Sequence, residues 1–253
     1  MSTPSTTTAG ILRPPLPLDD QEPNQIVIHP SARIHPSADL EDDVSVGAGT
    51  AIWHRTHVRT GARIGADCVI GGGVFIDEGV TIGDRVKIQS GALVYHGVTV
   101  DDGVFIGPGA ILTNDRFPRA TAPDGSLAEA EDWEVSPIHL ETGCSVGAGA
   151  VVVAGNDVGA YALVGAGAVV TQTVPSYALV VGNPARRIGW ACVCGHRLAD
   201  SQGHHAPAVR DRYAIDRELV CPACDRRYAF ALDDEALEEL EEQTDPVMQA
   251  TDS

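Results

Sequence analysis

Aliphatic residues recur at every sixth position along most of the chain. Their series has fifteen members up to residue 112 and six more from residue 140 onward: Ile28, Ile34, Leu40, Val46, Ile52, Val58, Ile64, Ile70, Ile76, Ile82, Ile88, Val94, Val100, Ile106, Leu112, Leu140, Val146, Val152, Val158, Val164 and Val170. A six-residue period is typical of a parallel β-helix, in which three strand-plus-turn repeats complete one triangular coil. The pattern predicts an all-β fold of about seven coils over residues 26–190.

Small or β-branched residues form a second series, four positions after the aliphatic one. It includes Ala62, Cys68, Val74, Ala92, Ala110, Cys144, Ala150, Ala162 and Ala168. Both series must face a narrow interior, because one repeat cannot bury its apolar side without stacked neighbours. Cys68 and Cys144 are therefore expected in the core, where a thiol packs as a small apolar group.

Polar residues eighteen positions apart are expected on the same edge of successive coils, about 4.8 Å from one another. One such column contains Thr60, Glu78, His96 and Asn114, and another contains His54, Gly72 and Ser90. Their side chains must project outward, since the interior accepts only apolar groups.

The period is interrupted once, between Leu112 and Leu140, so residues 113–139 are predicted to leave the solenoid as a loop. Long loops on a regular scaffold usually have a function. Asn114, Arg116 and Arg119 stand at its start, and a planar guanidinium suits phosphate or carboxylate recognition. The loop recognises an anionic group or braces a neighbouring subunit, and the two interpretations are compatible.

Composition narrows the possible partners. The formal net charge is -18, which argues against nucleic acid, and Lys87 is the only lysine. There is neither an apolar run of membrane-spanning length nor a basic segment followed by an apolar one, so we expect a cytoplasmic protein without a membrane partner. Residues 1–25 are rich in Ser, Thr and Pro and are expected to be disordered.

Four cysteines lie beyond the repeats, in Cys192-Val-Cys194 and Cys221-Pro-Ala-Cys224. Two thiol pairs in a chain without an export signal suggest a structural four-thiolate zinc site in a ribbon-like module at 191–232. Unliganded thiols are the alternative, and His196, His204 or His205 are possible replacement ligands. Residues 233–253 are expected to form an acidic tail or a terminal helix.

The repeats and the closing segment at 174–189 resemble the left-handed β-helix acyltransferases that use acetyl-coenzyme A. Residues 52–58 (IWHRTHV), 94–99 (VYHGVT), 112–115 (LTND) and 189–195 (GWACVCG) are similar to a narrower group. That group is the UDP-2-acetamido-3-amino-2,3-dideoxy-glucuronate N-acetyltransferases of surface-polysaccharide synthesis. The left-handed winding is implied by this resemblance alone, because crossovers in ordinary sheets are right-handed.

The resemblance implies a homotrimer with active sites between subunits and acetyl-CoA in the groove between adjacent prisms. Turn backbone at Gly165, Ala166 and Gly167 would bind the pantetheine arm, and Arg186 and Arg187 would pair with coenzyme phosphates. The residues expected to bind the UDP-amino-sugar are Lys87, Gln89, Ser90, Tyr95, Asn114, Arg116 and Arg119. Ser90 departs from the asparagine common in the family, and His96 stands at a variable turn position that disfavours it as a base.

The implied reaction is attack of the sugar 3-amine on the thioester carbonyl, which requires a proton acceptor and donors for the oxyanion. Histidine suits proton transfer near neutral pH. His54 is the first candidate and His57 the second; either one alternatively only orients the sugar, and the departing thiolate is a further possible acceptor. Other readings are acetyl transfer to a different sugar, a zinc hydratase resembling γ-class carbonic anhydrases, and a non-catalytic scaffold.

Overall fold

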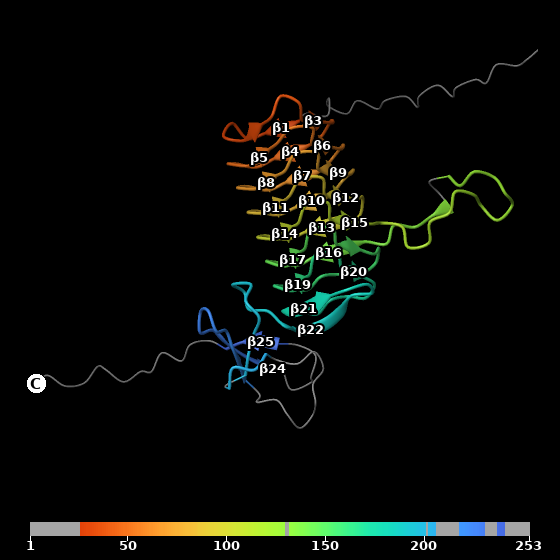
Figure 1. Cartoon of the computed structure of the whole chain (residues 1–253). Helices are drawn as coiled ribbons and strands as arrows, with labels where there is room; N and C mark the ends of the chain where they lie inside the picture. The colour runs from red at the N-terminus through yellow and green to blue at the C-terminus, as the bar shows by residue number, and fades with distance from the viewer. Residues whose placement is uncertain (1–25, 130–131, 201, 206–217, 231–236, 241–253) are drawn as a thin grey trace, which may run out of the picture.

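The chain folds into one stack of short strands from which a loop projects on one side (Figure 1). The computed structural model describes residues 26–129, 132–200, 202–205, 218–230 and 237–240. The segment expected to be disordered, 1–25, and most of the acidic segment at 233–253 lie outside these residues. Within the described part, there is no helix with the length and apolar character needed to cross a membrane.

Three sheets, parallel except for the last strand of the second, form the faces of the solenoid, and we name them A, B and C. In spatial order, sheet A contains β1 (Val27–Ile28), β4 (Ser45–Val46), β7 (Arg63–Ile64), β10 (Thr81–Ile82), β13 (Val98–Val100) and β16 (Ile138–Leu140). Sheet B contains β2 (Arg33–Ile34), β5 (Ala51–Ile52), β8 (Val69–Ile70), β11 (Lys87–Ile88), β14 (Phe105–Ile106), β17 (Ser145–Val146), β19 (Leu163–Val164), β21 (Ala178–Val181) and β22 (Arg186–Trp190). Sheet C contains β3 (Asp39–Leu40), β6 (His57–Val58), β9 (Phe75–Ile76), β12 (Leu93–Val94), β15 (Ile111–Leu112), β18 (Val151–Val152) and β20 (Val169–Val170).

Strand register follows the predicted eighteen-residue coil. Ile88 pairs with Ile70 on one side and with Ile106 on the other. Across the loop, Ile106 pairs with Val146, so the loop lengthens one coil without disturbing the stacking. The interruption predicted from the sequence is therefore an insertion into a continuous solenoid.

The prediction of a single interruption was wrong, because a second one shortens the last coil. Val158 pairs with Val174, and Val164 pairs with Val180, which leaves sixteen residues per turn there. The solenoid thus has seven complete coils and part of an eighth. β21 then leads into β22, which returns antiparallel to it and ends sheet B.

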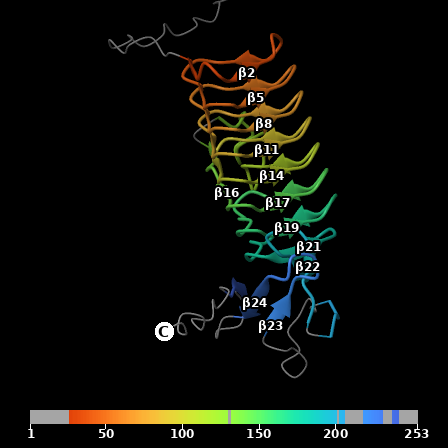
Figure 2. The ribbon, with the colours of Figure 1, turned by 90° about the vertical axis from the view of Figure 1, so that its left-hand side faces the viewer.

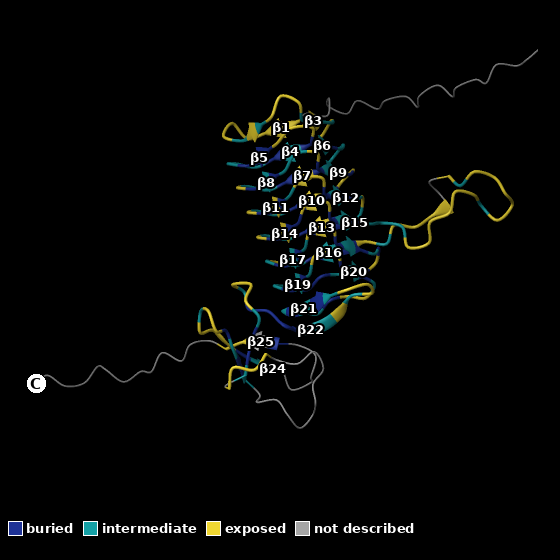
Figure 3. Ribbon diagram, viewed as in Figure 1, coloured by how far each residue is buried: buried dark blue, intermediate teal, exposed yellow. Residues whose placement is uncertain are grey.

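Both apolar series predicted from the sequence face the interior. Strand residues such as Ile70, Ile88 and Ile106 are fully buried, and Cys68 and Cys144 are buried with them as predicted. Figure 3 shows exposed residues gathered at the turns and along the projecting loop. Each buried isoleucine side chain stabilises the fold by about 1.5–3 kcal/mol relative to an exposed one.

Glycine is required where the turns of adjacent coils touch. A Cβ on Gly147 would lie 2.5 Å from the amide nitrogen of Ala166 on the next coil. No other residue fits at that separation without moving backbone. The glycines that follow the sheet B strands therefore set the close spacing of the coils.

The C-terminal segment forms a separate antiparallel sheet of β23 (Glu218–Val220), β24 (Arg227–Phe230) and β25 (Leu237–Glu239). The terminal helix suggested for this region is wrong for residues 237–239, which pair with β24 as a strand. Leu237 is buried in the same apolar cluster as the solenoid core. Packing against β24 has overridden the helical spacing of this acidic segment.

Candidate active site

Many of the predicted site residues lie on one edge of the solenoid. We call it the B–C edge, and it consists of the turns from sheet B to sheet C at residues 53–56, 71–74, 89–92, 107–110, 147–150 and 165–168. His54, Gln89, Ser90 and the turn at 165–167 belong to it. Figure 2 shows the sheet B strands that lead into these turns, stacked one above another. Three coil steps separate Ser90 from Ala166, about 14 Å at the usual strand spacing.

The ring of His54 lies over Gly72 of the next coil. A Cβ at Gly72 would be 2.6 Å from Cε1 and 2.7 Å from Nε2 of His54. From the preceding coil, the ring of His35 makes an edge contact with a centroid separation of 5.8 Å. The missing side chain at Gly72 gives His54 room to extend along the edge toward the turn that carries Ser90.

His57 lies on the outer face of sheet C and is held by a carboxylate. Its Nε2 is 2.8 Å from Oε1 of Glu41. The other oxygen of Glu41 accepts the backbone N–H of Thr60 at 3.0 Å and its hydroxyl at 2.9 Å. The backbone bond foremost, then the His57 and Thr60 side chains, lower the pKa of Glu41 to about 2. An ionised Glu41 orients the imidazole and leaves Nδ1 as its free basic atom.

His96 is oriented by the backbone at a second edge. This C–A edge consists of the turns from sheet C to sheet A at 59–62, 77–80 and 95–97 and of the loop. Nδ1 of His96 lies 2.8 Å from the carbonyl oxygen of Glu78. Because a carbonyl only accepts, Nδ1 carries the proton and Nε2 keeps its lone pair. His96 therefore has the geometry of an oriented base, which the sequence did not reveal.

Asp77 connects three successive turns of the C–A edge. One of its oxygens accepts from Arg59 at 2.9 Å and from the N–H of Glu78 at 2.8 Å, and the other accepts from the N–H of His96 at 3.1 Å. Burial alone would raise the pKa of Asp77, but these two N–H groups and the Arg59 guanidinium together lower it. Asp77 is thus an ionised support beneath His96.

An aromatic row crosses the outer face of sheet C. Tyr95 contacts Phe75 with ring centroids 5.7 Å apart, and Phe75 contacts His57 at 5.6 Å. The predicted substrate residue Tyr95 is thereby connected to the predicted base His57. Phe75 was not predicted; its aromatic side chain at an outward strand position was the available signal.

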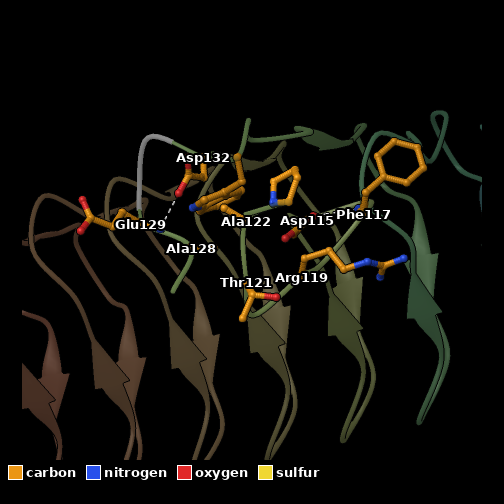
Figure 4. A pocket seen from close by; sticks show the side chains of 10 residues that line it. Asp115, Phe117, Arg119, Thr121, Ala122, Ala128, Glu129 and Asp132 are labelled. Carbon is orange, nitrogen blue, oxygen red and sulfur yellow. Dashed lines mark hydrogen bonds between the residues drawn. The ribbon is translucent and has the colours of Figure 1, made fainter. Parts of the chain in front are cut away.

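Residues of the loop between β15 and β16 line an open cavity of about 630 Å³ (Figure 4). The base of the loop is closed by a hydrogen bond from the N–H of Ser136 to the carbonyl of Asn114 at 3.0 Å. Arg119 lines the cavity. Arg116 instead lies against the solenoid, because a Cβ added to Gly155 would be 3.4 Å from its Nη1. The cavity is also lined by Asp115, Glu129, Asp132, Phe117 and Trp133. One guanidinium among three carboxylates favours a hydroxyl- or amine-bearing group over a phosphate.

The predicted coenzyme residues lie near one another at the far end of the B–C edge. Val181 pairs with Arg186 across the last two strands of sheet B. The Val181 side chain lies over Gly165, where an added Cβ would be 2.7 Å from it. Arg186 is therefore close to the turn at 165–167. The Arg187 guanidinium lies over the ring of Trp190, 4.5 Å from its centroid, so it is already engaged in a cation–π contact.

Lys87 lies on the outer face of sheet B, between Val69 and Phe105 of the adjacent strands. It is exposed and stands two residues before Gln89. This places an unburied ammonium at the approach to the B–C edge.

A second histidine–carboxylate pair lies where the loop returns to sheet A, and the sequence analysis missed it. Nε2 of His139 is 2.8 Å from Oδ1 of Asp101, and its backbone N–H donates to Asp157 at 2.8 Å. The position of His139 at the end of the predicted loop, directly before the repeat residue Leu140, was the signal that could have singled it out.

The four predicted zinc ligands come together at the C-terminal end of the stack. The sulfur atoms of Cys192, Cys194, Cys221 and Cys224 all lie within 4.8 Å of one another. His196 approaches only Cys194, with Nδ1 3.5 Å from Sγ, and His204 pairs with Asp200 at 3.4 Å. The structure thus favours the four-thiol set over the histidine replacements.

The repeats of this chain match two family models. Bacterial transferase hexapeptide (six repeats) matches residues 43–78 and 79–114, and the hexapeptide repeat of succinyl-transferase matches residues 61–96 and 137–172. These matches agree with the register of the strands. They support the predicted fold class, a left-handed parallel β-helix of hexapeptide repeats.

Curated relatives are similar to part of the chain. The dTDP-3-amino-3,6-dideoxy-alpha-D-galactopyranose 3-N-acetyltransferase of Aneurinibacillus thermoaerophilus is 44% identical over 92 residues, which are 36% of this chain and 40% of the relative. The 2,3,4,5-tetrahydropyridine-2,6-dicarboxylate N-acetyltransferase of Staphylococcus aureus is 47% identical over 58 residues, which are 23% of this chain and 24% of the relative. The matches therefore span less than half the length of these curated relatives.

Among solved structures, GDP-perosamine N-acetyl transferase from Caulobacter crescentus, in complex with CoA and GDP-perosamine, is 26% identical with a TM-score of 0.36. That match covers 66% of this chain and 58% of the other. A hexapeptide-repeat acetyltransferase from Vibrio cholerae in complex with acetyl-CoA is 26% identical with a TM-score of 0.40, over 49% of this chain and 67% of the other. By its repeats, this chain is similar to the hexapeptide-repeat transferases.

Proposed function

We propose that this chain is an acetyl-CoA-dependent N-acetyltransferase for the 3-amino group of a nucleotide-linked amino sugar. The observation that carries the proposal is the 44% identity over 92 residues to an enzyme named as a 3-N-acetyltransferase of a dTDP-linked 3-amino sugar. The motifs at 52–58 and 189–195 favour UDP-2-acetamido-3-amino-2,3-dideoxy-glucuronate as the acceptor, in surface-polysaccharide synthesis.

The layout of the B–C edge supports this reaction. His54, Gln89 and Ser90 lie toward one end and the turn at 165–167 toward the other, so an extended coenzyme arm along the edge would carry its thioester to the polar group. The backbone amides of the turns would stabilise the oxyanion. The four-cysteine cluster belongs to the C-terminal ribbon and takes no part in this chemistry.

We further propose that the protein is a homotrimer, with each site between two subunits. In one protomer, His54 and Ser90 lie on the B–C edge, whereas His96 and the loop lie on the C–A edge. Prisms packed side by side would bring the first edge of one subunit to the second edge of its neighbour. Asn114, Arg116 and Arg119 would then reach a sugar bound at Gln89 and Ser90.

In the proposed reaction, the lone pair of the sugar 3-amine attacks the thioester carbonyl carbon and forms a C–N bond. The C–S bond breaks as the tetrahedral intermediate collapses, and the coenzyme leaves as its thiol. His54 accepts the amine proton and passes it to the leaving sulfur, with His57 as the second candidate for this role. His96 is a third, because its fixed tautomer directs a free Nε2 outward.

The test is turnover of a panel of UDP- and dTDP-linked amino sugars with acetyl-CoA, read by coenzyme thiol release and by the mass of the product. We expect acetylation of a 3-amino group and calorimetric binding of acetyl-CoA. Products acetylated only on hydroxyl groups would refute the substrate assignment, and failure to bind acetyl-CoA would favour a scaffold. His54→Asn, His57→Asn and His96→Asn, each confirmed to keep the wild-type assembly, identify the base through loss of kcat and of its pH dependence.

A further inference from the structure

We propose that Cys192, Cys194, Cys221 and Cys224 bind one zinc ion, and that the zinc-bound ribbon is the cap that closes the C-terminal end of the solenoid. The argument rests on the arrangement of the four sulfur atoms and on the packing between ribbon and last coil. It is independent of the proposed acetyl transfer.

The separations between the sulfur atoms fit a tetrahedral ion. Sγ of Cys192 lies 3.5 Å from that of Cys224, and Sγ of Cys194 lies 3.5 Å from those of both Cys221 and Cys224. Zinc–sulfur bonds of about 2.3 Å in a tetrahedron place the sulfurs about 3.8 Å apart. A disulfide requires about 2.05 Å, and all four cysteines are free.

The backbone presents the sulfurs in two tight turns. In the first, the N–H of Gly195 donates to the carbonyl of Cys192 at 2.8 Å; in the second, the N–H of Asp225 donates to the carbonyl of Cys221 at 3.0 Å. Ala199 and Val220 exchange backbone hydrogen bonds at 3.1 and 2.8 Å, which hold the two turns side by side. Backbone pairing thus holds together the two turns that carry the thiol pairs.

Hydrogen-bond donors surround two of the four sulfurs. Backbone N–H groups of Ala223 and Cys224 donate to the sulfur of Cys221, and that of Arg226 donates to the sulfur of Cys224. The Arg226 guanidinium lies 3.4 Å from Cys224. Four thiolates around a divalent ion carry a net charge of about -2, which these donors and the guanidinium offset. All four ligand positions are filled by the chain, so the site is structural and leaves no open position for catalysis.

Tyr228 connects this site to the solenoid. Its hydroxyl lies 3.1 Å from Sγ of Cys192 and accepts the N–H of Val193 at 3.2 Å, so its own proton is available to the sulfur. Its ring contacts Tyr177 of the last coil with centroids 5.4 Å apart, and Tyr177 stacks on Tyr161 one coil earlier at 5.5 Å. The metal site and the solenoid thus share one fully buried side chain.

A parallel solenoid needs such a cap, because its final coil would otherwise expose the end of the core to water. The ribbon and β25 supply the cover: Leu198, Leu219, Tyr228 and Leu237 are buried in the same cluster as the solenoid interior, beside Trp190 of β22. A hydrogen bond from the N–H of Ala191 to the carbonyl of Tyr177, at 2.7 Å, fixes the connection. Loss of the ion is therefore expected to loosen the last coil before the first.

The first test is metal analysis of the full chain, purified without chelator. We expect one zinc per chain, retained by Cys144→Ala, which removes a core thiol, and lost from Cys194→Ser, whose side chain is exposed. Addition of Co²⁺ to the metal-free protein should produce the visible bands of tetrahedral tetrathiolate cobalt. Absence of both zinc and those bands, or a full equivalent of iron instead, would overturn the assignment.

The second test separates the capping role from simple metal binding. Tyr228→Phe should weaken zinc binding by about 10- to 100-fold through loss of the hydrogen bond to sulfur. Hydrogen exchange should accelerate at residues 174–190 after chelation and stay unchanged at 58–100. Equal exchange in both segments would refute the cap, whereas the calorimetric affinity for acetyl-CoA, measured on the zinc-loaded protein, tests the proposed function separately.

Discussion

Gly71 and Gly72, adjacent on the B–C edge, allow the stability of the solenoid to be separated from the orientation of His54. A Cβ at Gly71 would lie 2.6 Å from the amide nitrogen of Ser90 and 2.9 Å from the carbonyl carbon of Gln89. A Cβ at Gly72 would instead meet ring atoms of His54 at 2.6 to 3.0 Å. The clash at Gly71 is with backbone atoms and is relieved only if a whole coil moves. The clash at Gly72 is with a ring that can rotate about its side-chain bonds. Alanine at the two positions should therefore have opposite consequences.

Gly71→Ala overpacks the contact between coils, which typically costs about 1–3 kcal/mol. In a chain of this size, each kcal/mol lowers the melting temperature by about 2–4 °C, so a drop of about 2–12 °C is expected. Gly72→Ala should melt within about 2 °C of the wild type. Because it displaces His54 by an ångström or more, it should lower kcat/KM for the proposed reaction by about 10- to 100-fold.

Thermal unfolding followed by circular dichroism measures the loss of stability. On the same preparations, a thiol reagent that detects released coenzyme measures turnover, and His54→Asn is the reference for complete loss of the imidazole. If Gly72→Ala melts as low as Gly71→Ala, the described packing of this edge is wrong. If it stays folded and turns over at the wild-type rate, His54 does not act where the structure places it.

Three further outcomes are expected. Ile88→Ala should destabilise the fold by about 2–5 kcal/mol in thermal melts, since it leaves a cavity between two coils; a loss below 1 kcal/mol would contradict the register. Asp77→Asn should cost about 1–2 kcal/mol at pH 7 through its bond to Arg59. Because the folded-state pKa of Asp77 is lowered, this difference should vanish as the pH falls below the usual 3.8, and a difference that persists in acid would refute the ion pair. Replacing residues 116–134 by a short glycine–serine turn should leave melting within about 3 °C and raise the sugar KM, whereas a large loss of stability would show that the loop supports the solenoid.

Much of the fold could be predicted because the hexapeptide pattern is local and repetitive. The inward positions accept only small or aliphatic side chains. The burial of Ile88 and Cys144 therefore follows from their place in the repeat and needs no information about distant residues. The insertion after Leu112 is readable for the same reason, as a loss of period. The sixteen-residue last coil was missed because two members of the series, Val174 and Val180, resume after a gap of only four residues.

The candidate site was predicted less completely, because its geometry depends on contacts across coils. The columns of His54 and His96 follow from spacing, but the carboxylate on His57 comes from Glu41, sixteen residues earlier, and the one on His139 comes from Asp101. No local pattern shows which side chain bends toward which. The carbonyl that fixes the tautomer of His96 is likewise a matter of backbone position.

The sequence by itself determined the solenoid, the place of its inserted loop and the four cysteines that could share a metal, because each depends on residue type at a fixed spacing. Tertiary structure alone decided that residues 237–239 form a strand and that the four sulfurs converge on one point. It also decided that Gly72 makes room for His54. The physical reason is that these features arise from packing between segments distant in sequence, where side-chain direction and backbone pairing outweigh local preference.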